Sequence, residues 1–530
     1  MGGSRLHNFE RPFVLAVDAG TESVRASIFD VTGQLVIFHV SEYPVNFPRP
    51  GWAEQSPDDW WRAMVWAVRG AINKSGLKAE DIAALGLDTT CCSVVFMDSK
   101  RKRVLRPSLI WMDVRATEQA KRIAATGNQA LKYNGWTGVS PEWMPCKVLW
   151  VKENEPDIYT QADTIFEYLD WMIYRLTGRI TASINNTTVR WYYNRREGGW
   201  PEDFYEEIGL LDALDRFPGV ILNMGEPVGE LLPEVAEELG LKAGIPVAEG
   251  GADAYVATLG LNIVQPGRLA LITGSSHMQL GLTREQSHHK GIFGAFPDAT
   301  IPGYSVVEGG QISSGSILKW FRQNFLGAQE AEARAAGISV YRMLDEQAAQ
   351  LPPGSEGIIV LDYWQGNRTP WVDPEARGVF WGLSLKHKPA NLYRAIMEGV
   401  AYGTHHILST WRTAGFEIGE VYACGGATQS PLWLQIHADV ANVPIHLTRV
   451  QEAASLGSAV LAAVAAGIYP STTEAADKMV TVVRTVYPDA QRHEEYQFFY
   501  EQYVQTYLQL KGLMHSVTRY VAKTKENAQE

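Results

Sequence analysis

Polar and acidic side chains gather where two apolar runs of the chain are joined by a tight turn. The turn reads Asp18-Ala19-Gly20-Thr21-Glu22-Ser23 and stands between the runs 14–17 and 24–29. Glycine lets the backbone bend close to a ligand, and hydroxyls and turn amides donate hydrogen bonds to an anion. Because Asp18 would repel a bare anion, the combination favours a phosphate that carries a metal ion. A plain hairpin turn is the alternative that these residues allow.

A second turn repeats this design about half a chain later. Thr273-Gly274-Ser275-Ser276 lies within 268–282, between two apolar runs. Two hydroxyl-rich hairpin tips in one chain indicate a duplicated domain. If the two copies face each other, their tips could hold a polyphosphate from both sides.

Glycine pairs also stand where a predicted strand passes into a helix. Gly250 and Gly251 leave space for a substrate ahead of Asp253. This carboxylate could accept a proton from an attacking hydroxyl, or it could cap the helix. Gly425 and Gly426 end another strand, where a purine or a phosphate could approach the backbone, or where the chain simply turns tightly.

Composition limits the classes of protein that are plausible. The 530 residues suffice for two or more domains, and 46% hydrophobic with 20% charged residues is ordinary for a globular protein. The net charge of −12 argues against a nucleic-acid partner. The four cysteines show neither a disulfide framework nor metal spacing. A polar N-terminus and the lack of a bilayer-length apolar run favour a cytoplasmic protein without a membrane partner.

Strand and helix patterns alternate along the chain, which predicts an α/β fold. Helices are expected over 56–76 and 162–178, and a strand over 82–90. The run 452–467 is rich in alanine, glycine and serine. It predicts a helix that packs closely against a neighbouring element.

Six segments, in this order, resemble the FGGY carbohydrate kinases. They are DAGTESVR (18–25), GGADAYVATLG (250–260), LITGSSHMQ (271–279), the run 378–403, the run 425–445 and EAASLGSA (452–459). The resemblance extends from about 12 to about 512. It implies an α/β, two-lobed fold of the actin, hexokinase and Hsp70 type, in which duplicated ribonuclease H-like domains flank a central cleft. The expected division is an N-terminal lobe at 1–248, a C-terminal lobe at 249–480 and a helical segment with a tail at 481–530.

The resemblance also implies chemical roles. Asp253 would be the catalytic general base, Asp18 would hold Mg²⁺ through water, and the partners would be a small-molecule sugar and ATP. The residues expected to bind ATP are Asp18, Gly20, Thr21, Glu22, Ser23, Thr273, Gly274, Ser275, Gly310, Gln311, Gly315, Gly425, Gly426, Ala427 and Asn442. Asn442 could equally end a helix. Many relatives form homodimers, so a homodimer is open here.

Two segments that resemble ribulokinases, and a third that resembles pentulokinases, indicate the acceptor. GLDTTCCSVV (86–95), WMDVRA (111–116) and the stretch 363–378 favour a ketopentose, with ribulose above xylulose and D-ribulose first. The expected sugar contacts are Thr90, Cys91, Asp113, Arg115 and Asp253. Asp113 and Arg115 could instead form a structural pair.

Several other functions stay open. Within the family, the acceptor could be L-ribulose, xylulose, a polyol such as erythritol or ribitol, or a quorum signal. A non-catalytic sugar or nucleotide sensor could share the fold, although a sensor would be free to lose Asp253. A chaperone ATPase would need a peptide-binding β-domain and a lid, which the sequence does not indicate.

Overall fold

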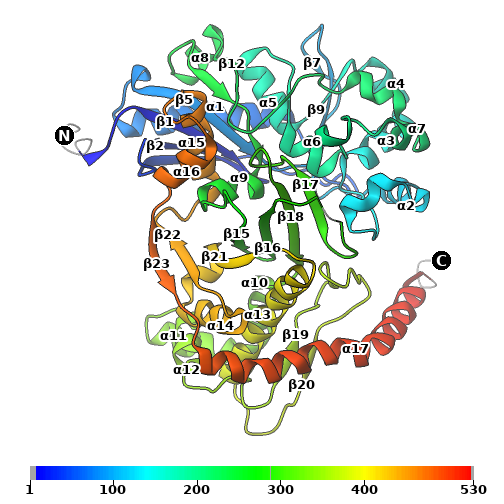
Figure 1. Ribbon diagram of the computed structural model, residues 1–530, viewed down its shortest axis with the longest axis vertical. Helices are drawn as coiled ribbons and strands as arrows, with labels where there is room; N and C mark the ends of the chain where they lie inside the picture. Colours follow the sequence, from blue (N-terminus) through cyan, green and yellow to red (C-terminus); the bar gives the residue numbers. More distant parts are fainter. Residues whose placement is uncertain (1–7, 287, 527–530) are drawn as a thin grey trace. The chain divides into compact units, whose positions relative to one another are not determined.

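The computed structural model describes residues 8–286 and 288–526, which divide into two compact units (Figure 1). The first unit comprises Met1–Gln265, Leu282–Val307 and Arg449–Thr481, and the second comprises Pro266–Gly281, Glu308–Thr448 and Val482–Glu530. The predicted ranges 1–248, 249–480 and 481–530 do not coincide with this division, because the chain passes from one unit to the other several times. Residues 1–7 and 527–530, to which the expectations of a polar N-terminus and a C-terminal tail extend, lie outside the described residues.

A mixed β-sheet forms the centre of the first unit. Its strand order is β12-β13-β5-β1-β2-β3, and β14 also pairs with β5. β1 pairs antiparallel with β2 and parallel with β5, and β13 is parallel to β5 but antiparallel to β12. The strands are β1 (Phe13–Ala19), β2 (Ser23–Asp30), β3 (Leu35–Glu42), β5 (Ile82–Thr89), β12 (Pro227–Glu230), β13 (Pro246–Ala248) and β14 (Gly251–Ala252).

The sheet of the second unit repeats this topology. Within it, β18, β16, β15, β21, β22 and β23 are neighbours in that order, which again places an antiparallel partner on one side of β15 and a parallel partner, β21, on the other. β22 is parallel to β21 and antiparallel to β23. The strands are β15 (Gly267–Thr273), β16 (His277–Thr283), β18 (Ser305–Gln311), β21 (Ile418–Gly425), β22 (Ile445–Thr448) and β23 (Val482–Val486). β15 and β16 thus correspond to β1 and β2, as the two similar hairpin tips predict.

A smaller sheet in the first unit includes the last two residues of the segment 86–95, and one of its strands ends just ahead of the segment 111–116. Its order is β4-β8-β6-β7, and β9 pairs with β6. The strands are β4 (Glu54–Gln55), β6 (Val94–Asp98), β7 (Arg103–Val104), β8 (Ser108–Leu109) and β9 (Thr164–Glu167). The helix expected over 162–178 begins only at Tyr168, because the β-branched and aromatic residues of β9 are buried in pairing with β6.

Helices cover these sheets. In the first unit the longer ones are α1 (Pro57–Ser75), α2 (Thr117–Thr126), α3 (Met144–Asn154), α5 (Tyr168–Thr177), α6 (Ile184–Arg190), α8 (Pro233–Leu239), α9 (Asp253–Gly260), α15 (Ala453–Ala465) and α16 (Thr472–Met479). In the second unit they are α10 (Gly315–Phe325), α11 (Gly327–Ala335), α12 (Val340–Ala348), α13 (Pro389–Thr413), α14 (Pro431–Ala441) and α17 (Ala490–Glu526). The predicted helix 56–76 is confirmed: Pro57 begins it, and Gly76 ends it with φ of 73°.

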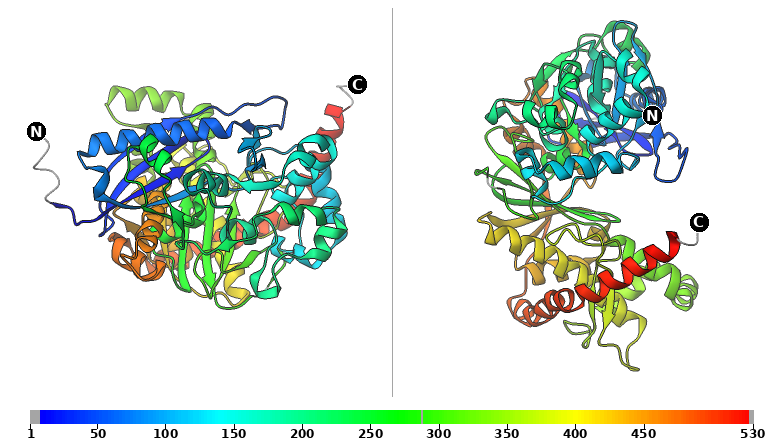
Figure 2. Two further views of the ribbon diagram at one scale, coloured as in Figure 1. Left: turned by 90° about the horizontal axis from the view of Figure 1, so that it is seen from above. Right: turned by 90° about the vertical axis from the view of Figure 1, so that its right-hand side faces the viewer.

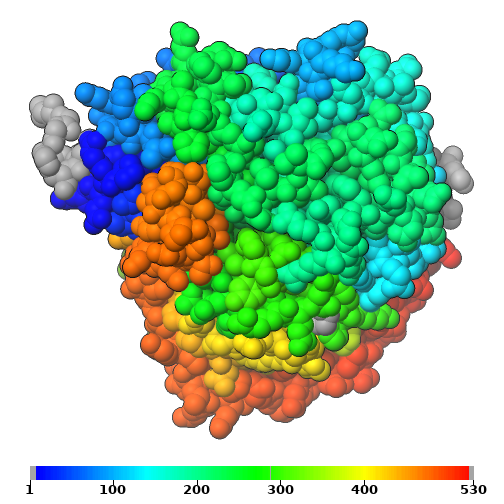
Figure 3. Space-filling model, turned by 45° about the horizontal axis from the view of Figure 1, so that its top comes forward, coloured from blue at the N-terminus to red at the C-terminus, as the bar shows by residue number. Residues whose placement is uncertain are grey.

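The small-residue helix α15 packs closely against α9 and β5 within the first unit, as its composition predicts. A Cβ atom added at Gly457 would stand 2.1 Å from the carbonyl oxygen of Val256 in α9, and one at Gly86 in β5 would stand 2.0 Å from that of Ser458. Both distances are far below van der Waals contact, so glycine is required at both positions. Figure 3 shows the segment 449–481 in orange beside the blue and green atoms of the first unit.

The chain ends in the long helix α17, drawn in red in Figure 2. It packs on α14 and β19 (Ile359–Leu361) within the second unit, where Tyr496, Tyr503 and Tyr507 are buried. Among residues 8–286 and 288–526, no helix combines the length and the apolar character that crossing a bilayer requires.

Candidate active site

The β1–β2 turn is held in place by several hydrogen bonds. Gly20 N donates to Ser23 O at 3.0 Å and closes the turn. The hydroxyl of Tyr43 donates to Gly20 O, and Gln55 Nε2 donates to Thr21 O at 2.6 Å. Thr21 and Ser23 stay half-buried, with their side chains at the tip of the hairpin. Hydrogen bonds from Tyr43 and Gln55 therefore hold the backbone carbonyls of the predicted phosphate turn.

Three carboxylates of the first unit lie close to one another. Asp18 near the end of β1 is opposite Asp88 near the end of β5, and Asp88 is in turn opposite Gly251, just ahead of Asp253. Burial raises the pKa of each of the three. The negative charge of Asp18 raises the pKa of Asp88 and Asp253 further. Asp88 lies in the segment 86–95 but was not among the site residues expected from the sequence.

Asp253 is the first residue of α9 and does not cap it. The N-cap position belongs to Ala252, and Asp253 Oδ1 accepts a hydrogen bond of 2.7 Å from Ala254 N. Burial and the charge of Asp18 raise the pKa of Asp253 to about 6. A carboxylate with this pKa is ionised at neutral pH and is more basic than an exposed aspartate, which suits a general base.

Two serines of α15 contact this carboxylate group. Ser455 Oγ donates to Asp18 Oδ2 at 3.1 Å, and Ser458 Oγ donates to Asp88 Oδ2 at 2.6 Å. These serines come from a segment more than 360 residues further along the chain. Sequence reasoning identified α15 as a closely packed helix but missed its serines as part of the site.

The corresponding turn of the second unit, between β15 and β16, is more exposed. Gly274 and Ser275 are exposed, and Gly274 N donates to Ser276 O at 2.9 Å. The carbonyl oxygen of Gly274 accepts from Gly315 N at 3.2 Å. A Cβ at Gly315 would stand 2.4 Å from that oxygen, so glycine allows the close approach of α10 to the turn.

Thr273 has a structural role in this geometry. Its hydroxyl donates to Cys424 O at 2.6 Å and accepts from Ala427 N at 3.0 Å. Gly425 has φ of 88°, and a Cβ there would stand 1.9 Å from Thr273 O. Thr273 therefore holds β21 and the glycine pair in place, and its hydroxyl is already engaged by the backbone.

A cavity of about 830 Å³ opens beside these glycines in the second unit. Gly274, Gly315, Gly426 and Ala427, all predicted to bind ATP, line it. Further lining residues that sequence reasoning missed come from α12 and from α13 and α14; they include Tyr341, Arg342, Asp345, Tyr393 and Trp433. No short motif marks the α12 residues, so the sequence carried no signal for them.

Three other predicted ATP contacts do not line this cavity. Gln311 is 5% exposed, and its amide bonds Gln279, Asp362, Val400 and Thr404. Gly310 is buried, with its N–H directed to Thr369 Oγ1 at 3.3 Å. Asn442 has φ of 53° and ends α14, which is the alternative that the sequence left open. Direct contact of these three residues with ATP stays a prediction without geometric support.

The predicted sugar segment after β5 adjoins the phosphate turn. Thr90 is buried, and its N–H donates to Ala19 O at 3.1 Å. Cys91 is half-buried, and Cys92 is buried with φ of 58°. Thr90 and Cys91 therefore lie beside the β1–β2 turn, where a sugar bound near Asp18 could reach them.

Asp113 and Arg115 form the structural pair that the sequence analysis kept as an alternative. Asp113 is 0% exposed, and both of its carboxylate oxygens accept from Arg115 at 2.7 to 3.0 Å. Ala53 N donates to Asp113 Oδ2 at 2.7 Å. The carboxylate has no exposed oxygen for a sugar hydroxyl, so the geometry favours the structural reading, and a sugar contact stays untested.

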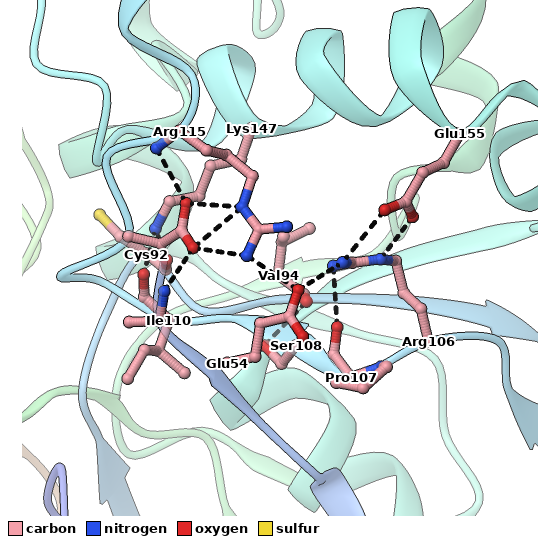
Figure 4. A network of polar contacts seen from close by, with 12 residues as sticks. Glu54, Cys92, Val94, Arg106, Pro107, Ser108, Ile110, Arg115, Lys147 and Glu155 are labelled. Atoms are coloured by element: carbon pink, nitrogen blue, oxygen red, sulfur yellow. Dashed lines mark hydrogen bonds and ion pairs between the residues drawn. The ribbon is translucent and has the colours of Figure 1, made fainter. Parts of the chain in front are cut away.

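Arg115 belongs to a partly buried chain of charges (Figure 4). Its guanidinium contacts Glu54 Oε1 at 2.8 Å. Arg106 contacts the same Glu54 oxygen at 2.9 Å and also pairs with Glu155 at 2.7 Å. The Arg115 guanidinium also stands 3.7 Å from the ring centre of Trp52. The segment 110–116 is thereby fixed to the small sheet.

Lys147 ties the same region together from α3. Its Nζ donates to Cys92 O and to Ile110 O, at 2.6 Å each (Figure 4). Burial lowers the pKa of this lysine, while Asp113 is among the neighbours whose charge raises it. Lys147 thus joins the segment after β5 to the segment after β8.

Comparison with known proteins agrees with this architecture. Residues 13–260 match the N-terminal domain of the FGGY family of carbohydrate kinases, and residues 269–466 match its C-terminal domain. A ribulokinase from Halalkalibacterium halodurans is 33% identical, over 93% of this chain and 94% of that protein. An FGGY carbohydrate kinase domain-containing protein from Xenopus laevis is 32% identical, over 93% of this chain and 95% of that protein.

A solved structure shows the same fold. A xylulose kinase from Rhodospirillum rubrum superposes with a TM-score of 0.84 at 25% identity, over 95% of this chain and all of that chain. The two-domain α/β architecture expected from the sequence is confirmed. The chain therefore belongs to the FGGY family of carbohydrate kinases, enzymes that transfer a phosphoryl group to an alcohol.

Proposed function

We propose that this kinase transfers the γ-phosphoryl group of ATP to the terminal hydroxyl of a ketopentose, with ribulose as the first candidate and D-ribulose favoured. The observation that carries the proposal is the position of Asp253 beside Asp18, with a pKa raised to about 6. Ribulose is supported by the ribulokinase among the similar proteins and by the segments 86–95 and 111–116. Xylulose is the second candidate, because a xylulose kinase shares the fold at 25% identity.

Asp253 would act as the general base. Phosphoryl transfer depends mainly on positioning and on neutralising charge, and the attacking hydroxyl must lose a proton. The carboxylate of Asp253 accepts that proton, and Ala254 N keeps its Oδ1 in place at 2.7 Å. The backbone amides and hydroxyls of the β1–β2 turn would hold the phosphates beside it.

The carboxylates suit a magnesium ion that keeps most of its water. Among the described residues, no group of three or more His, Cys, Asp and Glu side chains could hold a metal ion. Magnesium needs no such group, since one or two carboxylates, waters and phosphate oxygens satisfy it. Asp18 would hold it through water, with Ser455 fixing Oδ2. Bound there, magnesium would neutralise phosphate charge.

The cavity of the second unit suits an adenosine. Its volume of about 830 Å³ lies within the range of small-molecule sites. Gly426 and Ala427 at its wall leave the backbone open to a flat ring. Tyr341 and Trp433 supply aromatic surface, and Asp345 supplies a hydrogen-bond acceptor.

Release of ADP against a panel of acceptors tests the proposal. The panel comprises D-ribulose, L-ribulose, D- and L-xylulose, ribitol, erythritol and glycerol, each with Mg-ATP. We expect the highest kcat/KM with one ketopentose. Activity confined to polyols would overturn the acceptor, and ATP binding without turnover of any acceptor would favour a sensor.

A variant of the proposed base tests the mechanism separately. Asp253→Asn should lower kcat by at least a hundredfold and leave the Kd of ATP, measured by calorimetry, within about threefold. Asp157→Asn, at an exposed position, is the matched control and should behave as the wild type. Turnover retained by Asp253→Asn would remove Asp253 from the role of base.

A further inference from the structure

A tryptophan outside the phosphate turn contacts its hydroxyl. Trp111 follows β8, and its indole Nε1 donates a hydrogen bond of 2.9 Å to Thr21 Oγ1. The two residues are 90 positions apart and belong to the same unit. Trp111 is 38% exposed, so it is no part of the hydrophobic core. The contact joins the segment 111–116, which resembles the ribulokinases, to the β1–β2 turn, which would hold phosphate.

This bond fixes what the hydroxyl of Thr21 can do. An indole N–H can only donate, whereas a hydroxyl has one proton to donate and two lone pairs that accept. Thr21 Oγ1 is therefore the acceptor from Trp111, and its own proton points elsewhere. Within the described part of the chain, no side chain or carbonyl accepts that proton. The half-buried hydroxyl can therefore donate to water or to a bound ligand.

Hydrogen bonds hold the backbone at Thr21 and directly ahead of Trp111. Gln55 donates to Thr21 O at 2.6 Å, and Gln55 Oε1 itself accepts from Trp60 Nε1 at 3.0 Å. Lys147 holds Ile110 O at 2.6 Å, directly ahead of Trp111. With both backbones held, the indole N–H occupies one lone pair of Thr21 Oγ1 and restricts the directions open to the hydroxyl proton.

We propose that Trp111 is a positioning residue that turns the Thr21 hydroxyl into an oriented donor toward the transferred phosphoryl group. This inference rests on the proposed function, in which the β1–β2 turn holds the phosphates. It also gives the Asp113–Arg115 pair a purpose, since that pair fixes the segment from which Trp111 reaches Thr21. One hydrogen bond thereby couples the segment 111–116, which resembles the ribulokinases, to the β1–β2 turn, which would hold phosphate.

The test is a double-mutant cycle. Trp111→Phe keeps one aromatic ring and removes the N–H donor together with the second ring of the indole, and Thr21→Ala removes the hydroxyl. We expect Trp111→Phe to lower kcat about tenfold, the usual order for one hydrogen bond, with the KM of the ketopentose within twofold. Thr21→Ala should lower kcat at least as much. Adding Trp111→Phe to Thr21→Ala should cause no further loss, because the oriented group is already absent.

Two controls separate positioning from general damage. Trp66→Phe changes a tryptophan that is 67% exposed on α1, and it should leave kcat unchanged. Thr21→Ser retains a hydroxyl, and its kcat should still depend on Trp111. Melting temperatures of all variants should agree within about 2 °C, since neither side chain is fully buried.

The outcomes distinguish this inference from the proposed function. If Thr21→Ala lowers kcat while Trp111→Phe does not, or if the two losses multiply, Trp111 has no positioning role and the inference is wrong. If Thr21→Ala changes neither kcat nor the calorimetric Kd of ATP, the phosphate role of the turn fails, and the inference fails with it.

Discussion

The Asp113→Asn substitution replaces one oxygen of a buried carboxylate and keeps the shape of the side chain. In the wild type both oxygens accept from Arg115 at 2.7 to 3.0 Å, and Oδ2 also accepts from Ala53 N at 2.7 Å. The amide nitrogen of asparagine can only donate, so it would face N–H groups and lose their hydrogen bonds. The Arg115 guanidinium would keep its contact with Glu54 at 2.8 Å but lose its second negative partner.

The expected cost follows from this geometry. Removing one partner of a buried ion pair costs about 3–5 kcal/mol, because the remaining charge stays desolvated. Glu54 still compensates Arg115 in part, so we expect the lower end, about 3 kcal/mol. For a domain of this size 1 kcal/mol corresponds to about 2 °C, which gives a fall of about 6 °C in the melting temperature of the first unit.

Calorimetry of matched variants tests this prediction. Asp113→Asn should melt about 6 °C below the wild type, and the double variant Asp113→Asn/Arg115→Met should recover part of the loss by removing both charges. Glu118→Gln disrupts the Lys121–Glu118 pair, whose side chains are 68% and 76% exposed, and should leave the melting temperature within about 1 °C.

Enzyme kinetics measured well below the melting temperature complete the test. The KM of the ketopentose should stay within twofold of the wild-type value in Asp113→Asn, because the carboxylate has no exposed surface. An unchanged melting temperature together with a KM raised more than tenfold would refute the reasoning. It would show that Asp113 binds the sugar, as the sequence first suggested.

Three further predictions concern packing and titration. Gly457→Ala should destabilise the first unit by about 1–3 kcal/mol, because its Cβ would stand 2.1 Å from Val256 O; calorimetry that matches the wild type would contradict this close packing. The kcat/KM should fall about tenfold per pH unit below about 6, since the proposed base Asp253 must be ionised; a profile flat to pH 5 would exclude it. Burial raises the pKa of Glu249 from 4.5 to about 8, so the folded state binds a proton that the unfolded state has lost, and stability falls as pH rises through this window by up to about 1.4 kcal/mol per unit. The melting temperature of Glu249→Gln relative to the wild type should therefore rise from pH 5 to 8, whereas the exposed control Glu206→Gln should show no trend.

Local structure was largely predictable from the sequence. Alternating apolar residues around Gly20 and Gly274 require hairpins, and their repetition correctly indicated that one sheet topology is used twice. The small residues of α15 predicted close packing, since only glycine avoids a clash at position 457. The helix predicted over 162–178 was wrong at its start, because pairing with β6 overrides the local helical pattern in β9.

The roles of individual side chains depended on contacts between distant segments. The hydroxyl of Thr273 is of a type that can bind a ligand, yet the backbone of Cys424 and Ala427, more than 150 positions away, engages it. The carboxylate of Asp113 accepts from nearby Arg115, and the fold adds a further donor, Ala53 N, from 60 positions away. Residue type alone cannot reveal this, because the donor that satisfies an acceptor comes from elsewhere in the chain. The α12 residues that line the cavity belong to no short motif, so only the folded chain identifies them.

The sequence by itself determined the family, the two hairpin turns and the aspartate proposed as the base, because these depend on residue type and short spacing. Tertiary structure decided which groups surround them. Ser455 reaches Asp18 across 437 positions and Trp111 reaches Thr21 across 90. The physical reason is that the polarity and orientation of a side chain depend on its nearest donors and acceptors, and only the folded chain brings these together.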